Sequence, residues 1–303
     1  MMKHTALQHQ LASLAAGVEL RFDEPMAKHT SFRVGGGAEI MAFPKDGEEL
    51  AQLLQAARSL EVEPRILGAG TNVLAPDGGL PGLTICLKDC LNGMLQLDES
   101  HIQVMAGVTM SRAAMYAANL GLSGLEFAHG IPGTVGGGVY MNAGAYGGEI
   151  CQVCDSVVVM DRQGVMRRIF GEEMGFSYRH SRLEDSGEVV VCVDFALTPA
   201  PQVTILARMK ELIAKRSASQ PLDLPSAGSA FKRPQGGYAA ALIDQAGLKG
   251  YRVGDAAISE KHGGFAVNLG EATAEDVKTL LRQVSDRVYE NSGIRLEPEI
   301  RIW

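Results

Sequence analysis

The stretch GIPGTVGGGVYMNAGAYGGEI, residues 130–150, determines how the rest of the sequence is interpreted. Eight of its 21 residues are glycine, and its first charged side chain is that of Glu149. Glycine loses more backbone entropy on folding than any other residue, so such a density needs a specific use. Bare backbone brings N–H donors close to an anion, and Val135 and Val139 favour burial over mobility. The stretch predicts a ligand-binding loop, with a glycine-rich hairpin or a mobile loop as the alternatives.

A second glycine motif, LGAGTNVL at residues 67–74, predicts a strand, a turn and a further short strand. Its small residues let N–H groups approach an anion, and Thr71 and Asn72 add side-chain donors. It is not a Rossmann fingerprint, because no helical pattern follows the glycines, and it lacks the Gly-Lys-Ser/Thr of a Walker loop. A tight turn explains this motif equally well when it is taken alone. Together, two such segments suit a long ligand that bears a pyrophosphate.

Composition restricts the class of protein. The chain has 303 residues, enough for two domains with a large buried core. Its formal net charge of −7 argues against nucleic acid as a partner, since phosphate binding needs a surplus of Lys and Arg. No apolar run approaches the roughly 20 residues of a membrane span, and residues 1–17 do not resemble a signal peptide. We expect a cytoplasmic protein, with a monomer as the default state.

The five cysteines fit reduced thiols in a cytosolic protein. Cys151 and Cys154 form a Cys-x-x-Cys pair that could be half a zinc site or a redox pair. A zinc site needs four ligands, however, and no second pair of this kind follows. The apolar run 156–160 comes directly afterwards, where small buried thiols are common. We therefore expect no metal site.

Short apolar runs separated by glycine turns alternate with a few amphipathic segments along the chain. Helices are expected at 6–16, 48–61, 111–120, 203–217, 238–246 and 273–291, and strands at 83–87, 101–105, 156–160, 189–196, 264–268 and 294–303. In the middle of the chain a single helix interrupts several short strands, which favours an α+β fold over a regular βαβ winding. The segment LTPAPQ, residues 197–202, is expected to link two domains.

Seven motifs occur in a characteristic order: SFRVGGGAE, LGAGTNVL, GIPGTVGGGVYMNAGAYG, YRHS, PSAGSAFKRP, KHGGFAVN and LEPEI. With them the chain resembles the UDP-N-acetylenolpyruvoylglucosamine reductase family, shorter class, from about Lys28 to Ile302. The resemblance implies an FAD-binding domain of the vanillyl-alcohol-oxidase type at 1–198, made of two α+β subdomains at about 1–67 and 68–198. A smaller α+β substrate-binding domain follows at 199–303, and its last strand, 294–303, is expected to return to the FAD domain. One departure is Gly37, where the family often has proline.

The resemblance also implies an activity: reduction of UDP-N-acetylglucosamine enolpyruvate by NADPH through noncovalent FAD. Hydride from the reduced flavin would reach C3 and a proton would reach C2. The residues expected to bind the cofactor come from the two glycine motifs: Gly68, Ala69, Gly70, Thr71, Asn72, Gly130, Ile131, Pro132, Gly133, Thr134, Gly136, Gly137, Asn142 and Gly144.

Three residues are expected to be catalytic by the same resemblance. Arg179 would bind the substrate carboxylate, Ser229 would protonate C2, and Glu299 would share a hydrogen bond with the carboxylate if it is itself protonated or bridged through Arg179. Without the resemblance, each has a simpler interpretation: Arg179 as a surface ion pair with Glu184 or Asp185, Ser229 as a turn residue, and Glu299 as the exposed face of a strand.

The substrate pyrophosphate needs cations. Lys232 is favoured because it lies three residues from Ser229, and Arg216 and Tyr178 are further candidates for substrate binding. Lys215 and Arg233 are other cations in this region, and Lys261 with His262 forms a weaker candidate pair.

Two alternative functions stay open from the residues. An oxidase on the same scaffold would tether its flavin through a histidine, and His129 precedes the glycine stretch. A regulatory nucleotide-binding module would need the glycine loops but not the Arg–Ser–Glu set.

Overall fold

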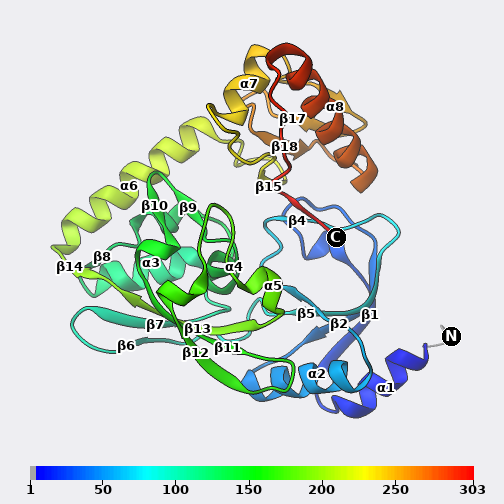
Figure 1. Cartoon of the computed structure of the whole chain (residues 1–303), viewed down its shortest axis with the longest axis vertical. Helices are drawn as coiled ribbons and strands as arrows, with labels where there is room; N and C mark the ends of the chain where they lie inside the picture. Colours follow the sequence, from blue (N-terminus) through cyan, green and yellow to red (C-terminus); the bar gives the residue numbers. More distant parts are fainter. Residues whose placement is uncertain (1–4) are drawn as a thin grey trace. The chain divides into compact units, whose positions relative to one another are not determined.

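The structure is a computed structural model that describes residues 5–303. The first four residues of the segment 1–17, which was compared with signal peptides above, lie outside the described residues. The chain forms two compact units (Figure 1). The first comprises residues up to Phe22, Ile40–Ala69 and Gly82–Ala214, and the second comprises Asp23–Glu39, Gly70–Pro81 and Lys215–Trp303. The chain therefore passes between the units five times. Compact units need not coincide with ligand-binding domains, so the boundaries 1–198 and 199–303 stay a prediction.

A five-stranded antiparallel sheet forms the centre of the first unit, in the order β12 (Met166–Phe170), β11 (Cys154–Met160), β13 (Val189–Ala196), β7 (His101–Met105), β6 (Met94–Gln96). The first seven residues of β13 are buried, and all of them are hydrophobic except Asp194. The helices α3 (Met110–Asn119) and α4 (Val135–Tyr140) contribute buried residues to the same hydrophobic core.

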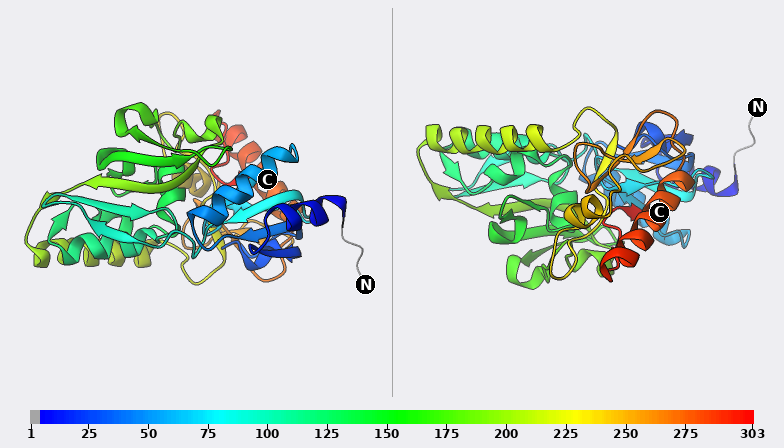
Figure 2. Two further views of the ribbon diagram at one scale, coloured as in Figure 1. Left: turned by 90° about the horizontal axis from the view of Figure 1, so that it is seen from below. Right: turned by 90° about the horizontal axis from the view of Figure 1, so that it is seen from above.

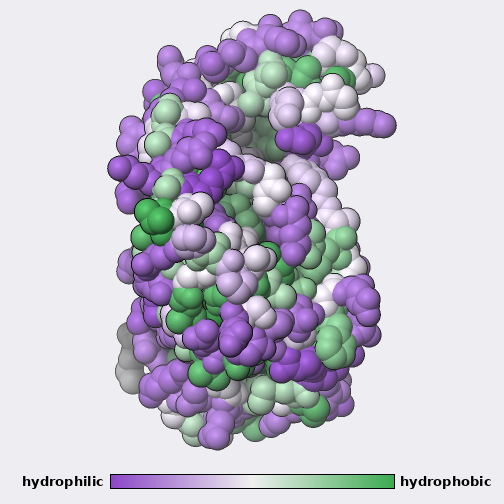
Figure 3. Space-filling model, turned by 90° about the vertical axis from the view of Figure 1, so that its left-hand side faces the viewer, coloured by the Kyte–Doolittle hydropathy of each residue, from purple (hydrophilic) through white to green (hydrophobic). Residues whose placement is uncertain are grey.

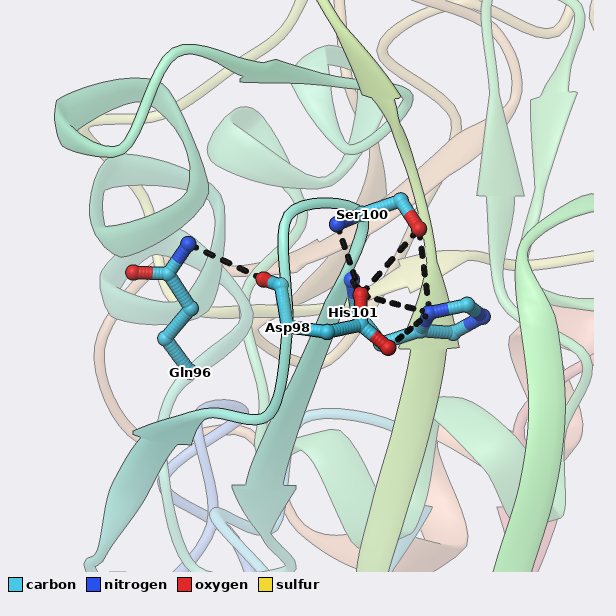
Figure 4. A network of polar contacts seen from close by, with 4 residues as sticks. All are labelled: Gln96, Asp98, Ser100 and His101. Atoms are coloured by element: carbon cyan, nitrogen blue, oxygen red, sulfur yellow. Dashed lines mark hydrogen bonds and ion pairs between the residues drawn. The ribbon is translucent and has the colours of Figure 1, made fainter.

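The β6–β7 turn is stabilised by one carboxylate. Asp98 accepts hydrogen bonds from the backbone N–H groups of Ser100 and His101, at 2.7 and 2.8 Å, and lies 2.9 Å from the His101 ring nitrogen Nδ1 (Figure 4). These interactions, the Ser100 N–H first among them, lower the pKa of Asp98 to about 2. Ser100 also contacts Nδ1 of His101, so the three residues do not form a Ser–His–Asp relay, which would use both ring nitrogens.

A second sheet has the order β1 (Glu19–Pro25), β2 (Gly37–Phe43), β5 (Leu80–Cys86), β3 (Arg65–Leu67). Three of these strands, β1, β2 and β5, have residues in both units. The helices α1 (Ala6–Leu14) and α2 (Gly47–Ser59) lie side by side in the first unit (Figure 2). Asp46 caps α2 by accepting from the N–H groups of Glu48 and Glu49.

The second unit has a four-stranded antiparallel sheet, in the order β15 (Ser226–Ser229), β18 (Phe265–Asn268), β17 (Ala256–Ile258), β16 (Arg252–Val253). The helices α7 (Ala239–Gln245) and α8 (Ala274–Ser292) share its hydrophobic core, together with Phe32, Val34 and Leu74 from early in the chain. Asp77 accepts from the N–H groups of Ala274 and Glu275, at 2.7 and 3.1 Å, at the start of α8.

The remaining elements are short, apart from the long helix α6. They are η1 (Met26–Lys28), β4 (Val73–Leu74), β8 (Leu122–Ser123), η2 (Glu126–Gly130), β9 (Gly144–Ala145), β10 (Gly148–Glu149), η3 (Ile150–Gln152), η4 (Gly171–Met174), α5 (Leu183–Ser186), β14 (Thr198–Pro199), α6 (Gln202–Ser219) and β19 (Arg301–Ile302). The six expected helices are present within about two residues of their expected ends, which is the usual uncertainty of helix boundaries.

Two expectations differ from the structure. The glycine stretch is not one continuous loop, because Val135–Tyr140 is helical, and only its last part forms a hairpin, in which β9 and β10 pair antiparallel. The expected strand 294–303 is reduced to β19, which pairs in parallel with β4. Before β19 the backbone pairs instead with residues 230–232, in an isolated bridge between Phe231 and Pro298.

None of the helices in residues 5–303 combines the length and apolar character of a membrane-crossing helix. Hydrophilic residues predominate on the face shown in Figure 3, with hydrophobic residues in small groups among them.

Candidate active site

The two glycine motifs approach each other within the first unit. A Cβ atom built at Gly68 would lie 2.7 Å from the hydroxyl oxygen of Thr134, closer than real Cβ atoms come to such an atom. Gly68 follows directly after β3, and Thr134 begins α4. The absence of a side chain at Gly68 therefore lets the turn after β3 lie against the start of the glycine-rich helix.

The N–H groups of α4 are largely used inside the protein. Those of Val135 and Gly136 donate to the carbonyls of Val108 and Ala106, at 2.8 and 2.9 Å. Those of Gly137 and Gly138 donate to the side chain and the carbonyl of Thr134. The glycine run is thus a capped helix, and it is not the row of open donors that its composition suggests. The donors adjacent to it belong to Gly133 and Thr134, whose N–H groups have no hydrogen-bond acceptor within residues 5–303.

The glycines of α4 are needed for different reasons. A Cβ atom at Gly136 would lie 3.0 Å from that of Ala106, and one at Gly138 would lie 2.7 Å from the sulfur of Met110. These two glycines let the helix pack tightly against its own unit. Gly137 is exposed, and a Cβ atom there would come no nearer than 3.6 Å to the Thr134 hydroxyl. Only the face at Gly137 offers bare backbone to a flat ligand.

Arg179 lies in a tight turn of the first unit. Ser177 and His180 exchange two backbone hydrogen bonds across this turn, at 3.1 and 3.2 Å, and Arg179 has a φ of +56°. Its guanidinium donates to the carbonyl of Gly144 at 3.1 Å, and its Cζ lies 4.9 Å from the ring centre of Tyr178. Glu184, one of the two alternative partners of Arg179, contacts the His180 ring at 3.0 Å.

The second unit brings together three further segments that the sequence singles out. Ser31 donates its N–H to the carbonyl of Gly70 at 3.0 Å and its hydroxyl to the carbonyl of Ser226 at 2.6 Å. Gly70 has a φ of +62°, and a Cβ atom there would collide with the carbonyl oxygen of His29. Ser31 therefore joins the second half of the LGAGTNVL motif to strand β15, which ends at Ser229.

Glu299 is held beside Ser229 by the backbone. The N–H of Glu299 donates to the carbonyl of Ala230 at 2.9 Å, and the N–H of Lys232 donates to the carbonyl of Glu297 at 2.9 Å. On its other side, the side-chain amide of Asn72 donates to the carbonyl of Glu299 at 3.3 Å. Ser229 and Glu299 are both half-buried. A hydroxyl and a carboxyl group thus share a small region of one unit.

The expected cations have different environments. Lys232 is 46% exposed and lies 3.5 Å from the carboxylate of Glu297, so it has a partner before any phosphate binds. Arg216 is half-buried on α6, and the backbone carbonyl of that residue accepts from Gln220. Lys261 donates to the carbonyl of Ser217 at 2.7 Å, at the end of α6, where a cation is favourable.

The Cys-x-x-Cys pair has the character of structural thiols. Burial raises the pKa of Cys154 to about 12, while Cys151 is exposed and its N–H donates to Asn142 at 2.9 Å. In residues 5–303 no group of three or more His, Cys, Asp or Glu side chains is arranged to hold a metal ion.

Comparison with known proteins defines the class first. A model of an FAD binding domain matches residues 38–169, and a model of the C-terminal domain of UDP-N-acetylenolpyruvoylglucosamine reductase matches residues 220–303. The chain is therefore an FAD-dependent flavoprotein with a second, C-terminal domain.

The relatives define the family. UDP-N-acetylenolpyruvoylglucosamine reductases of Streptococcus pneumoniae strains JJA and P1031 are each 41% identical over 297 residues, which is 98% of this chain and 98% of theirs. The crystal structure of UDP-N-acetylenolpyruvylglucosamine reductase from Thermus caldophilus is 40% identical with a TM-score of 0.78, covering 94% of this chain and 98% of that one. The chain belongs to the UDP-N-acetylenolpyruvoylglucosamine reductase family, and its 303 residues fit the shorter class. The expected α+β fold with an FAD-binding domain is confirmed.

Sequence reasoning missed the residues that hold the site together. Ser31 belongs to the motif SFRVGGGAE, but nothing local distinguishes its hydroxyl from that of any other serine in a loop. Asn142 and Asn72 were assigned to the cofactor, whereas their side chains bond to the protein itself. Their roles toward a cofactor stay a prediction.

Proposed function

We propose that this protein reduces the enolpyruvyl group of UDP-N-acetylglucosamine enolpyruvate with NADPH and so forms UDP-N-acetylmuramate, a precursor of peptidoglycan. Family membership supports the proposal, and one observation carries it: the hydrogen bond from the N–H of Glu299 to the carbonyl of Ala230. This bond holds the Glu299 segment against the residue that follows Ser229, so an acid and a hydrogen-bonding carboxyl group are available together. The same proposal includes a cytoplasmic location and a monomeric state.

The residues fit FAD at the start of α4. The backbone N–H groups of Gly133 and Thr134 can donate hydrogen bonds to a phosphate oxygen of FAD. The exposed backbone at Gly137 leaves room for a flat ring. Gly68 and Ala69, beside Thr134, complete the part of the cradle that lies in the first unit. When bound there, FAD would supply the hydride chemistry of the reaction, with NADPH as the source of the electrons.

The protein's own residues provide the polar chemistry of the reaction. Arg179 binds the substrate carboxylate through its planar guanidinium and favours the negative charge that develops when C3 accepts hydride. Ser229 donates its hydroxyl proton to C2, a C–H bond forms, and the serine recovers a proton from solvent. An alcohol is a weak acid, but C2 at this stage is a much stronger base than water. Glu299 shares a hydrogen bond with the carboxylate.

The UDP part of the substrate needs positive charge and a stacking surface. Lys232 is the favoured cation, with Arg216 as the second, and Tyr178, which is 45% exposed, is the proposed stacking surface. Since the Lys232–Glu297 pair is exposed, a diphosphate can replace Glu297 at little cost.

The decisive experiment separates the two half-reactions. The purified protein should be yellow, should bleach anaerobically with NADPH, and should regain its colour on addition of the enolpyruvyl substrate. Ser229→Ala should bleach at a nearly normal rate but reoxidise with substrate at least about 100-fold more slowly, the usual range of general-acid catalysis. Ser229→Cys should recover part of this rate. Reoxidation of Ser229→Ala at the wild-type rate would exclude Ser229 as the acid.

The flavin is proposed to be noncovalent. The ring nitrogen Nδ1 of His129 lies 3.1 Å from the hydroxyl of Ser111, so this histidine already has a partner. Precipitation in acid should release all yellow colour into the supernatant; colour retained in the pellet would favour an oxidase with a tethered flavin.

A further inference from the structure

The backbone of Arg179 is strained. A φ of +56° is unusual for a residue other than glycine and persists only where the surrounding structure imposes it. Two side chains fix the turn from outside. Ser181 donates its hydroxyl to the carbonyl of Tyr140, at the end of α4, at 2.8 Å. Asn142 donates its amide to the carbonyl of Ser177 at 3.0 Å.

Asn142 is buried beside the turn, and its side chain makes three hydrogen bonds. Only 1% of its surface is exposed, and its own φ is +41°, which asparagine tolerates better than most residues. Besides Ser177, its amide reaches the carboxylate of Glu149 at 3.1 Å, and its oxygen accepts from the N–H of Cys151 at 2.9 Å. Two residues further along, the carbonyl of Gly144 accepts from the guanidinium of Arg179. One short segment therefore fixes both the backbone and the side chain of Arg179.

We propose that Asn142 is a positioning residue that sets the place of the Arg179 guanidinium for the substrate carboxylate. The proposal rests on the role of Arg179 in the proposed function. Without the amide of Asn142, the carbonyl of Ser177 keeps the hydrogen bond from the His180 N–H but loses the one from Asn142, so one contact that opposes relaxation of the strained turn is removed. A displacement of the guanidinium by about 1 Å is enough to lower a reaction rate by about 100-fold.

The test uses Asn142→Gly in the full-length, flavin-loaded protein. Glycine adopts a positive φ without strain, so the substitution removes the three side-chain hydrogen bonds and leaves the backbone conformation accessible. If Asn142 acts by positioning Arg179, the flavin content and the rate of bleaching by NADPH stay normal; loss of flavin would instead return Asn142 to the cofactor site and overturn the proposal. The rate constant of reoxidation by substrate should fall by at least about tenfold. The amplitude of the reoxidation phase should stay unchanged, so that the slower rate does not reflect a smaller fraction of active enzyme.

A double-mutant cycle distinguishes positioning from general support of the fold. In the Arg179→Ala background, Asn142→Gly should slow reoxidation by less than about twofold further, since its effect acts through the missing guanidinium. The matched control is Ser156→Ala, which removes a buried hydroxyl bonded to Asp194 in the sheet of the same unit. It should lower the melting temperature without a selective loss of the substrate half-reaction.

Three further outcomes overturn the proposal: an unchanged reoxidation rate in Asn142→Gly, an equal loss in both half-reactions, or full additivity with Arg179→Ala. If Asn142→Gly does not fold, Ser181→Ala, which releases the same turn at its other end, decides by the same criteria. Normal reoxidation in Arg179→Ala would instead refute the proposed function of Arg179. This outcome is therefore distinguishable from a failure of the positioning role of Asn142.

Discussion

The side-chain amide of Asn72 donates to the backbone carbonyl of Glu299 across 3.3 Å, although the two residues are 227 positions apart in the chain. The carbonyl of Asn72 in turn accepts from the N–H of Arg301 at 3.0 Å. Asn72 therefore contacts the chain at two points that follow the Glu299 side chain, whereas the Ala230 carbonyl binds the N–H that precedes it. Between them, Asn72 and Ala230 fix the backbone that presents the proposed catalytic carboxyl group.

Asn72→Ala tests whether this contact or cofactor binding is the main use of Asn72. If the contact with Glu299 dominates, the flavin content stays normal and substrate-dependent reoxidation slows by about tenfold, the value of one hydrogen bond at about 1–1.5 kcal/mol. Flavin content is measured by absorbance and reoxidation by anaerobic stopped flow. A colourless Asn72→Ala protein with an unchanged melting temperature would return Asn72 to the cofactor site.

Alanine substitutions at two neighbouring glycines separate packing from ligand binding. Gly136→Ala brings a methyl group to 3.0 Å from that of Ala106, so it should lower the melting temperature, with an overpacking cost of about 1–3 kcal/mol. Gly137→Ala meets no such obstacle and should stabilise the flavin-free helix by up to about 1 kcal/mol.

The same Gly137→Ala variant should bind FAD more weakly, because its methyl group occupies the exposed face of α4. Flavin affinity is measured by fluorescence quenching on titration of the apoprotein with FAD. Unchanged affinity in Gly137→Ala would remove this face from the proposed cradle.

The Lys232–Glu297 ion pair allows substrate affinity to be changed in both directions. Lys232→Ala should raise KM for the UDP substrate with little effect on bleaching by NADPH, since a cation that contacts the diphosphate is lost. Glu297→Gln removes the competing carboxylate 3.5 Å from Lys232 and should lower KM slightly. Arg208→Ala, which breaks an exposed pair with Glu211 on α6, serves as the control and should leave KM unchanged. Equal KM values in all four proteins would place the diphosphate elsewhere.

His262 should make the second unit sensitive to acid. Burial lowers the pKa of its ring below the usual 6.5, and the charge of Lys249 acts in the same direction. Its Nδ1 accepts from the N–H of Gly264 at 3.1 Å, which requires a neutral nitrogen. Because the unfolded chain binds this proton more readily, the contribution of His262 to stability is present above about pH 6.5 and is lost as the pH falls through the lowered pKa.

His262→Gln keeps an acceptor for Gly264 without a titrating group. The fall in melting temperature between about pH 7.5 and pH 5.5 should therefore be smaller in His262→Gln than in the wild type. The comparison uses calorimetry of both proteins in the same buffers. An identical fall in the two proteins would show that His262 is not the group responsible.

The sequence patterns predicted helices and strands best where burial follows a simple period. The helix at Gly47–Ser59 and the strands at His101–Met105 and Val189–Ala196 are of this kind. Helix α4 was missed because glycine has a low helix propensity, and close packing of Gly136 on Ala106 overrides that preference. Thr134 was the available signal, since threonine is a favourable N-cap.

Candidate site residues could be proposed from the sequence and their roles stay predictions, whereas the contacts that support them could not be predicted. Motif order identified Arg179, Ser229 and Glu299 as candidates, and backbone pairing indeed holds Ser229 and Glu299 in one region. The turn that holds Arg179 at a positive φ is bound by the side chains of Asn142, from elsewhere in the chain, and Ser181, next to the turn itself. Such long-range determinants leave no local pattern.

The five crossings between the compact units have a consequence for modularity. A fragment that begins at residue 220 would lack Phe32, Val34 and Leu74 from its core and the Asp77 cap of α8. The C-terminal region therefore cannot be exchanged between relatives as a single contiguous segment. A functional chimera must take residues 23–39, residues 70–81 and the C-terminal region from the same relative. A chimera made with a single crossover should therefore be insoluble, whereas one in which all three segments are exchanged together should fold.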